Sequence, residues 1–343
     1  MHIKRIFKYE FWPFWLFYIP AYCYYFYLAI KAKRWVYFST LNTCMDYGGA
    51  FLSSKNNYLK FIPKNWMPRT VYAQKNDLFE KTQKLLSKNN ITFPLIVKPD
   101  MGERGKNVAL IYTEKELENY LLNIKEPVLI QEYISYPIEL GILFFWDTNN
   151  KPCISSIGVK KFCEIEGNGK DTLEKIVLKN HRIAKRKNIL KEKFKPKWQQ
   201  IIPKGEKILI EPIGNHNLGT TFYDGRKYYS EEMLSWVVEC VKNIPGFNYG
   251  RLDLKIENWS AFKQNRGVKL LEINGVNSEP IHIYDPNYFI LNAYKDIFYH
   301  MKIIYLLSKN KMDKKAPTVS LLEFLRGANK VLKKKKISKL LYS

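Results

Sequence analysis

The chain has 343 residues, with 56 lysines and arginines against 32 aspartates and glutamates, which gives a formal net charge of +24 at pH 7. This length suits one large or two to three smaller domains with a buried core. So strong a positive charge indicates an acidic partner, such as a nucleotide, a nucleic acid, an anionic lipid or a polyanionic substrate. The five cysteines are odd in number and widely spaced, without a Cys-x-x-Cys pair. This pattern argues against a disulfide framework or a zinc–cysteine site and favours a reducing compartment.

The N-terminal region is dominated by aromatic residues. Residues 11–30 read FWPFWLFYIPAYCYYFYLAI, without a charge, and are followed by Lys31, Lys33 and Arg34 rather than by a cleavage site. Twenty residues just meet the length of a membrane span, but aromatic side chains suit the membrane–water interface better. With the basic C-terminal stretch KVLKKKKISKLL, the segment favours a cytoplasmic protein held peripherally on the inner, anionic face of a membrane. Alternatively, the aromatics pack on the core and the lysines are solvated.

Strand and helix patterns become regular after a Gly/Ser/Asn-rich stretch at 42–57. An apolar run predicts a strand at 94–99, a two-glycine turn covers 101–107, and a second strand follows at 108–112. Thr113 and Glu116 form a capping box that predicts a helix to about residue 123. Three further strands are expected at 128–133, 139–146 and 154–159.

The second half of the chain repeats this mixture of elements. A very basic segment at 171–200 is expected to be helical, and it is followed by a strand at 207–211 and a helix at 230–243. Strands at 249–256 and 268–273 and an apolar helix at about 288–307 complete the set. No internal repeat is present. The order predicts an α+β fold with two sheet-rich blocks, at about 65–165 and 200–310.

The first candidate site is the glycine turn. Lys98 ends a strand, and Gly102 and Gly105 follow it within a loop that also carries Arg104 and Lys106. Glycines let backbone N–H groups approach phosphate oxygens, and the cationic side chains offset phosphate charge. An ordinary hairpin would have the same sequence features.

The second candidate site is a polar cluster on two strands. Arg251 and Asp253 alternate in GRLDLKI and therefore face one side, as do Glu272 and Asn274 in LLEIN. If these strands are neighbours, carboxylate and amide oxygens meet at one spot, and such oxygens suit Mg²⁺ bridging ATP phosphates. The alternative is an Arg–Asp salt bridge beside an exposed edge.

Four motifs in order resemble the ATP-grasp superfamily. They are VKPDMGERG, VLIQEYI with IEL, GRLDLK, and LLEINGVNSEP, and the resemblance spans about 55–305. It is strongest to the D-alanine–D-alanine ligase-like, carboxylate-amine ligase branch. The resemblance implies two α+β lobes with the nucleotide between them: 55–165 with the glycine loop and 166–310 with the metal and substrate site. The aromatic segment 1–54 and the basic tail 311–343 flank these lobes.

The resemblance also implies roles for individual residues. Arg251 and Lys98 would be catalytic, and Asp253, Glu272 and Asn274 would hold Mg²⁺ or Mn²⁺. The residues implied to bind ATP are Lys55, Lys98, Gly102, Arg104, Gly105, Gln131, Glu132, Tyr133, Ile134 and Glu139.

Two departures from that branch concern the substrates. Only about 50 residues precede Lys55, where these ligases usually carry an α/β domain, and GVNSEPIHIYDP lacks the usual Ser-Pro-Gly element. D-alanine specificity is therefore not expected. Other amide-forming relatives suggest substrate roles for Lys161, His216, Glu279 and His282, each of which could equally be a surface or capping residue.

The implied function is an ADP-forming ATP-dependent ligase that joins a small carboxylate to an amine through an acyl phosphate. A ligase with a different nucleophile and a non-catalytic nucleotide-binding protein at the membrane surface are the alternatives. A nucleic-acid binder is disfavoured because no recognition motif accompanies the charge or the basic segment 181–197.

Overall fold

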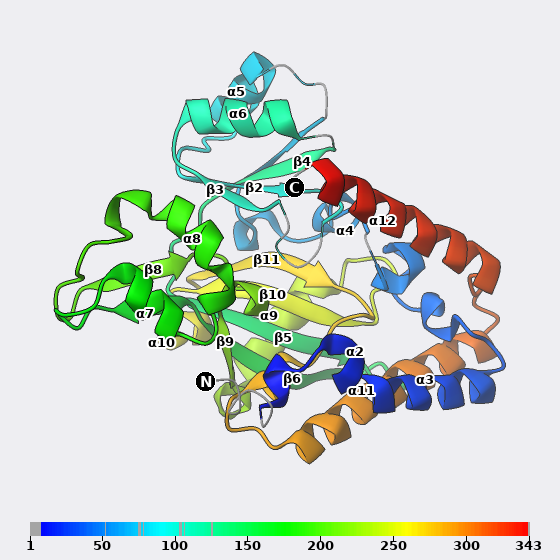
Figure 1. Ribbon diagram of the computed structural model, residues 1–343. Coiled ribbons are helices and arrows are strands. Elements are labelled where there is room, and N and C mark those ends of the chain that lie inside the picture. Colours follow the sequence, from blue (N-terminus) through cyan, green and yellow to red (C-terminus); the bar gives the residue numbers. More distant parts are fainter. Residues whose placement is uncertain are drawn as a thin grey trace.

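The structure is a computed structural model that describes residues 8–51, 53–74, 77, 79–102, 105, 107–124 and 126–341, without the side chains of Asn217 and residues 333–341. Two sheets form two lobes, and a long helix pair covers the larger lobe (Figure 1). The smaller lobe is drawn at the top of the view and the larger sheet below it. The predicted α+β composition is confirmed.

The smaller lobe is a four-stranded antiparallel sheet in the order β1-β4-β2-β3. Its strands are β1 (Thr70–Ala73), β2 (Leu95–Pro99), β3 (Ala109–Ile111) and β4 (Val128–Glu132). Helices α5 (Phe79–Lys88) and α6 (Glu114–Asn123) supply apolar side chains to its core. The predicted cap of α6 is present, because the Thr113 hydroxyl accepts a hydrogen bond from the Glu116 N–H at 3.2 Å. The short α4 (Asn56–Leu59) precedes this lobe.

The larger lobe is a five-stranded antiparallel sheet in the order β11-β10-β5-β6-β9. The strands are β5 (Ile138–Trp146), β6 (Pro152–Lys161), β9 (Thr221–Asp224), β10 (Tyr249–Ile256) and β11 (Val268–Asn274). Helices α9 (Glu231–Val241) and α10 (Trp259–Lys263) cover one face, where Trp236 is fully buried. Strands β5 and β6 hydrogen-bond into this sheet, so the boundary between the sheets lies before β5 rather than at residue 165.

The basic segment 171–200 differs from its prediction. It contains α7 (Leu173–Lys179) and α8 (Lys187–Lys193), with a short 3-10 turn at Ala184–Arg186 between them, rather than one helix. These helices pack with the two-stranded sheet of β7 (Cys163–Glu166) and β8 (Lys207–Glu211) around a small separate core. Helix α7 ends at Lys179, with Asn180 as its C-cap. After α8, the 3-10 turn at Lys195–Lys197 carries Pro196, a residue that does not fit the interior of an α-helix.

The aromatic segment forms helices that pack on the larger lobe. Pro13 precedes α2 (Phe14–Phe17) and Pro20 lies in the first turn of α3 (Ile19–Ala32), where proline is compatible with a helix. Helix α3 packs along α11 (Ile290–Asp313), and the tail carries α12 (Leu321–Leu341). No helix in the described part of the chain has both the length and the hydropathy needed to cross a bilayer.

Candidate active site

A cavity of about 780 Å³ lies where the two sheets face each other. Most of the predicted site residues line it, namely Lys55, Lys98, Gly102, Gly105, Gln131, Glu132, Tyr133, Ile134, Glu139, His216, Arg251, Asp253, Glu272, Asn274 and Glu279. Lys161 and His282 are not among its lining residues, and Arg104 lies outside the described residues. Residues more than 200 positions apart in the chain thus contribute to one cavity.

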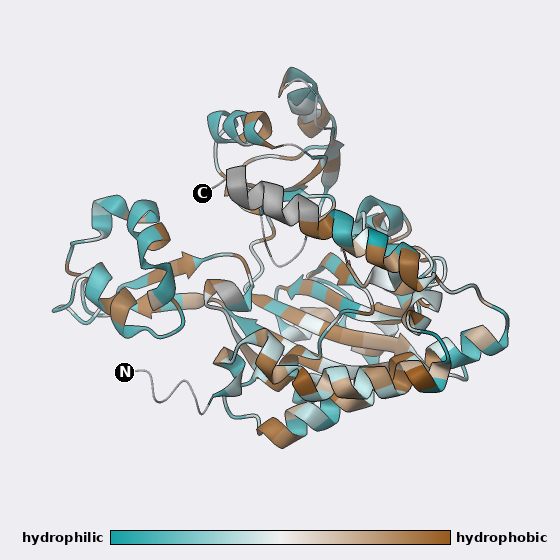
Figure 2. Ribbon diagram, turned by 45° about the vertical axis from the view of Figure 1, so that its right-hand side comes forward, coloured by the Kyte–Doolittle hydropathy of each residue, from teal (hydrophilic) through white to brown (hydrophobic). Residues whose placement is uncertain are grey.

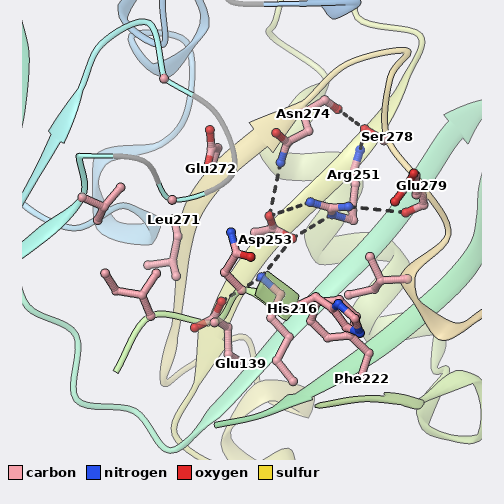
Figure 3. Close-up of a pocket in the computed structure, with 18 of the residues that line it drawn as sticks. Glu139, His216, Phe222, Arg251, Asp253, Leu271, Glu272, Asn274, Ser278 and Glu279 are labelled. Carbon is pink, nitrogen blue, oxygen red and sulfur yellow. Dashed lines mark hydrogen bonds and ion pairs between the residues drawn. The ribbon is translucent and has the colours of Figure 1, made fainter. Parts of the chain in front are cut away.

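The polar cluster of the second sheet assembles at the floor of this cavity. Strands β10 and β11 pair antiparallel, with Asp253 opposite Glu272 and Arg251 opposite Asn274. Arg251 donates to both oxygens of Asp253, at 2.9 and 3.1 Å, and the Asn274 amide donates to Asp253 Oδ2 at 3.2 Å (Figure 3). Burial alone would raise the pKa of Asp253, but Arg251 and Lys160 outweigh burial and hold that pKa below its ordinary value. Asp253 is therefore ionised and fixed in place.

Two lysines approach the cluster from the opposite side of the cavity. Lys98, at the end of β2, is buried and donates to the Leu271 carbonyl at 2.9 Å. Burial lowers the pKa of Lys98 to about 8, although Glu272 acts in the opposite direction. Lys55 forms an ion pair with Glu272 at 3.4 Å and donates to the carbonyls of Asp100 and Gly102, both at 3.1 Å. Lys55 thus stabilises the backbone that leads into the glycine loop.

A third lysine, not predicted from the sequence, connects the predicted ribose carboxylate to the polar cluster. Lys160 on β6 pairs with Glu139 at 2.8 Å and with Asp253 at 3.5 Å, and all three side chains are buried. Burial would lower the pKa of Lys160, yet Asp253 and Glu139 raise it above its ordinary value. The neighbouring Lys161, which was predicted instead, is exposed because successive strand residues face opposite sides.

The end of β4 and the residues that follow it border the cavity. The Gln131 amide donates to the Thr70 hydroxyl at 2.8 Å, and Glu132 pairs with Arg69 at 2.5 Å, so both side chains stabilise the sheet. The Ile134 carbonyl accepts from Lys255 Nζ at 2.8 Å. Lys255 continues the alternation of Arg251 and Asp253, a signal that the sequence analysis did not use.

The far end of the cavity is walled by the N-terminal aromatic segment. Tyr9, Glu10, Trp12, Phe14, Phe17 and Tyr18 all line it. The hydroxyls of Tyr18 and Tyr284 donate to the two carboxylate oxygens of Glu279, at 2.5 and 3.0 Å. The Glu279 carbonyl accepts from Arg251 at 3.4 Å. Glu279 is therefore held between the polar cluster and the aromatic wall.

A second carboxylate on this wall is Glu10, which nothing in the sequence analysis singled out. Arg182 donates to both Glu10 oxygens, at 3.1 and 2.8 Å, and His216 lies 3.6 Å from the same carboxylate. Burial raises the pKa of Glu10, but His216 and Arg182 more than compensate and lower it. Glu10 is thus ionised, and it ties the N-terminal segment to the β7–β8 unit.

His282 does not reach the cavity. Its ring is buried, with Nδ1 2.6 Å from the Ser156 hydroxyl and Nε2 2.9 Å from Asp296. Both nitrogens are therefore engaged in a link between β6 and α11. This arrangement assigns His282 a structural position.

The polar cluster offers oxygen atoms of the kind that a magnesium ion requires. Within the described residues, no three or more His, Cys, Asp or Glu side chains are grouped to hold a metal on their own. Mg²⁺ in nucleotide sites commonly takes one or two carboxylates and the substrate phosphates. Glu272 and the Asn274 amide oxygen fit that role, because Glu272 is about one-third exposed and faces the cavity. Asp253 is the more constrained carboxylate, since both its oxygens already accept from Arg251.

Comparison with known proteins matches part of the chain to one family. Residues 57–140 match the model of the RimK-like ATP-grasp domain. The large chain of carbamoyl phosphate synthase from Synechocystis sp. is 28% identical over 74 residues, which is 20% of this chain and 7% of that protein. The chain therefore spans only a small part of that relative's length.

Two solved structures resemble the chain at low identity. The D-alanine–D-alanine ligase of Bacillus anthracis has a TM-score of 0.45 and 16% identity, covering 77% of this chain and 69% of that one. A bifunctional glutathione synthetase from Pasteurella multocida has a TM-score of 0.40 and 14% identity, covering 71% and 36%. The match at 57–140 confirms the ATP-grasp resemblance that the sequence predicted.

Proposed function

We propose that this protein is an ADP-forming ligase that uses ATP to join a carboxylate to an amine through an acyl phosphate. One observation supports the proposal above all: cationic side chains and carboxylates from both lobes line a single cavity between the two sheets. Among them are the cations Lys55, Lys98, Lys160 and Arg251 and the carboxylates Glu139, Asp253 and Glu272. A buried cation such as Lys98, with no carboxylate in direct contact among the described residues, is stabilised when a phosphate oxygen approaches it.

The first step requires a substrate carboxylate beside the γ-phosphate. One carboxylate oxygen attacks phosphorus, the bond from phosphorus to the ADP oxygen breaks, and ADP leaves. Lys98 and Arg251 would offset the charge that develops on the transferred group. Glu272 and Asn274 would hold Mg²⁺, which supplies positive charge between the phosphates when bound. Glu139, fixed by Lys160, would orient the nucleotide.

The second step requires an amine at the other end of the cavity. The amine nitrogen attacks the acyl carbon, inorganic phosphate leaves and the amine loses a proton. Glu279, whose carboxylate oxygens accept from the Tyr18 and Tyr284 hydroxyls, provides negative charge on the aromatic wall, where an ammonium group would be favoured over a carboxylate. This charge pattern supports an amine rather than a thiol or hydroxyl as the acceptor.

Hydroxylamine trapping with the purified chain tests the proposal. ATP, Mg²⁺ and a panel of small carboxylates are supplied with hydroxylamine in place of the acceptor, and both ADP and hydroxamate are measured. We expect at least one carboxylate to give equal amounts of both products. ATP binding without ADP release on any carboxylate would instead favour a non-catalytic nucleotide-binding protein. ADP release with a carboxylate and a thiol or alcohol, but with no amine, would contradict the nitrogen acceptor.

A further inference from the structure

The outer side of the N-terminal helices carries an uncovered apolar stripe. Trp15 on α2 and four residues on α3 follow one another at spacings of three or four, which places them on one side of a helical path. They are Trp15, Ile19, Tyr22, Phe26 and Ile30, and each is between 45% and 67% exposed. A run of five large apolar side chains exceeds the scattered exposure usual on a soluble surface.

The stripe cannot be turned inward, because the opposite side of α3 is already packed. The Tyr24 ring lies 5.1 Å from the ring of Phe298, and Leu28 is buried in the cluster that contains Tyr305. At the start of the helix, the Tyr294 hydroxyl donates to the Phe17 carbonyl at 2.9 Å. The inner side of α2 and α3 thus packs against the cavity and α11. The outer side stays exposed, since the ring that Phe26 meets there at 6.2 Å belongs to Trp35, which is itself half-exposed.

Helix α11 adds an exposed face in which cationic and apolar residues alternate. Its solvent-facing positions recur at spacings of three or four, and they are Leu291, Lys295, Tyr299, Lys302, Leu306 and Lys309. Helices α3 and α11 lie side by side along the lower edge of the molecule in both ribbon views (Figure 2). The pair therefore carries both an exposed aromatic stripe, on α2 and α3, and a row of exposed lysines, on α11.

The charge around these helices is mainly positive. Lys31, Lys33 and Arg34 are exposed at the end of α3, and residues 14–32 contain no acidic residue. On α11, Asp296 is engaged with His282 and Tyr288, which leaves Asp313 at the last position of the helix. A partner with apolar interior and negative surface complements this combination, whereas a second copy of so basic a chain would be repelled.

We propose that α2, α3 and α11 form a docking surface for an anionic lipid bilayer, on which the helices lie in the interface without crossing it. The aromatic and aliphatic stripe would enter the region between headgroups and acyl chains, and the lysines of α11 would bind lipid phosphates. Amphipathic helices with aromatic residues on one side and lysines beside them bind interfaces in this way. This inference is independent of the proposed chemistry.

Vesicle co-sedimentation of the full chain tests the surface. The probes are vesicles of phosphatidylcholine alone and of equal parts phosphatidylcholine and phosphatidylglycerol, at low and high salt. We expect binding to the mixed vesicles that weakens with salt, and little binding to the neutral ones. The double variant Trp15→Ser, Phe26→Ser should bind at least about tenfold more weakly, because two large apolar side chains no longer enter the interface.

Charge and position controls separate the surface from general basicity. Lys302→Ala should weaken binding about fivefold, the change expected for one basic residue near an anionic surface. Leu122→Ser and Lys115→Ala alter equally exposed residues of the smaller lobe and should leave binding unchanged. Equal loss with these controls, or no vesicle binding by the natural chain, would overturn the proposal.

ADP release and sedimentation velocity separate loss of lipid binding from loss of activity and from self-association. Trp15 and Phe26 do not line the cavity, so the double variant should retain full ADP release in solution. Sedimentation velocity tests whether the stripe instead mediates self-association. A dimer that the double variant abolishes, without any vesicle binding, would assign the surface to a second copy and overturn the lipid proposal.

Discussion

Asp253 on β10 and Glu272 on β11 are direct cross-strand partners, yet their surroundings differ sharply. Asp253 accepts from Arg251 with both oxygens and also approaches Lys160, whereas among the described residues Glu272 pairs only with Lys55, at 3.4 Å. One carboxylate is thus a fixed structural anion and the other is available to a ligand. We therefore expect a substitution of Glu272 to affect ligand binding more than the fold.

Replacing Glu272 should remove activity without unfolding the protein. Glu272→Gln keeps the size of the side chain but removes the negative charge that a metal would need, so we expect ADP release to fall at least about a hundredfold. Circular dichroism and thermal unfolding should match the natural chain. Glu164→Gln, at an exposed position on β7, is the matched control. Normal turnover by Glu272→Gln would show that the metal assignment is wrong.

Replacing Lys160 should cost stability as well as activity. Lys160→Met leaves Glu139 and Asp253 buried without their shared cation, and loss of one partner of a buried ion pair costs roughly 3–5 kcal/mol. Urea unfolding measures this loss. The neighbouring Lys161→Met should change the free energy of unfolding by less than about 0.5 kcal/mol, because Lys161 is exposed. Equal effects of the two variants on the free energy of unfolding would contradict the assignment of Lys160 to the buried face of β6 and of Lys161 to its exposed face.

The depressed pKa of Lys98 gives nucleotide binding a pH dependence. In the free protein this pKa is about 8, so Lys98 loses its charge in the folded state well before it would in the unfolded chain. ATP affinity should therefore fall as the pH rises above about 8, as measured by calorimetry. Lys98→Arg should keep its charge and remove the decline between pH 8 and 10.

The same shift has a consequence for stability with a defined sign. Because the unfolded chain binds the Lys98 proton more tightly than the folded one, charged Lys98 destabilises the fold below pH 8. This contribution should disappear as the pH rises from about 8 toward the ordinary lysine value of about 10.5. The difference in unfolding free energy between the natural chain and Lys98→Met should shrink across this window. A difference in unfolding free energy that stays constant across this pH window would contradict the lowered pKa of Lys98.

Tyr18 should affect the acceptor end of the cavity selectively. Tyr18→Phe removes the hydroxyl that donates to Glu279 at 2.5 Å, so Glu279 is less firmly positioned. Once the substrates are known, we expect KM for the amine to rise about tenfold while the Kd for ATP stays constant. Tyr22→Phe, on the outer side of α3, is the control. A parallel loss of ATP affinity would contradict a role confined to the acceptor.

Asn42 anchors the start of the strand that carries Arg251 and Asp253. The fully buried amide donates to the carbonyls of Gly48 and Tyr249, at 3.0 and 2.7 Å, and accepts from the N–H groups of Asn248 and Tyr249. Asn42→Ala leaves buried backbone groups unpaired, so unfolding should become easier by roughly 3 kcal/mol in urea titration. Asn292→Ala, at an exposed position of α11, should have little effect.

Local sequence patterns predicted most of the strands that build the site. The two-residue alternation in GRLDLKI and LLEIN placed Arg251, Asp253, Glu272 and Asn274 on one face, and the register of β10 and β11 brings them together. The same alternation would have identified Lys255. Lys160 was missed because its partners, Glu139 and Asp253, lie on other strands and only the sheet order makes them neighbours.

The N-terminal segment could not be interpreted from its composition alone. Its aromatic residues serve two environments at once, since Phe17 and Tyr18 face the cavity while Trp15 and Phe26 face solvent. Only the packing of α3 on α11 separates these two sets. The ion pair of Glu10 could not be predicted either, because its partners Arg182 and His216 lie more than 170 residues away in the sequence.

A crystal structure with a non-hydrolysable ATP analogue and Mn²⁺ tests the central assignment most directly, because anomalous scattering locates the metal. The account predicts Mn²⁺ bound to Glu272 and Asn274, with the phosphates toward Lys98 and the ribose toward Glu139. Nucleotide bound outside the cavity between the sheets, or metal with no contact to Glu272, would contradict it.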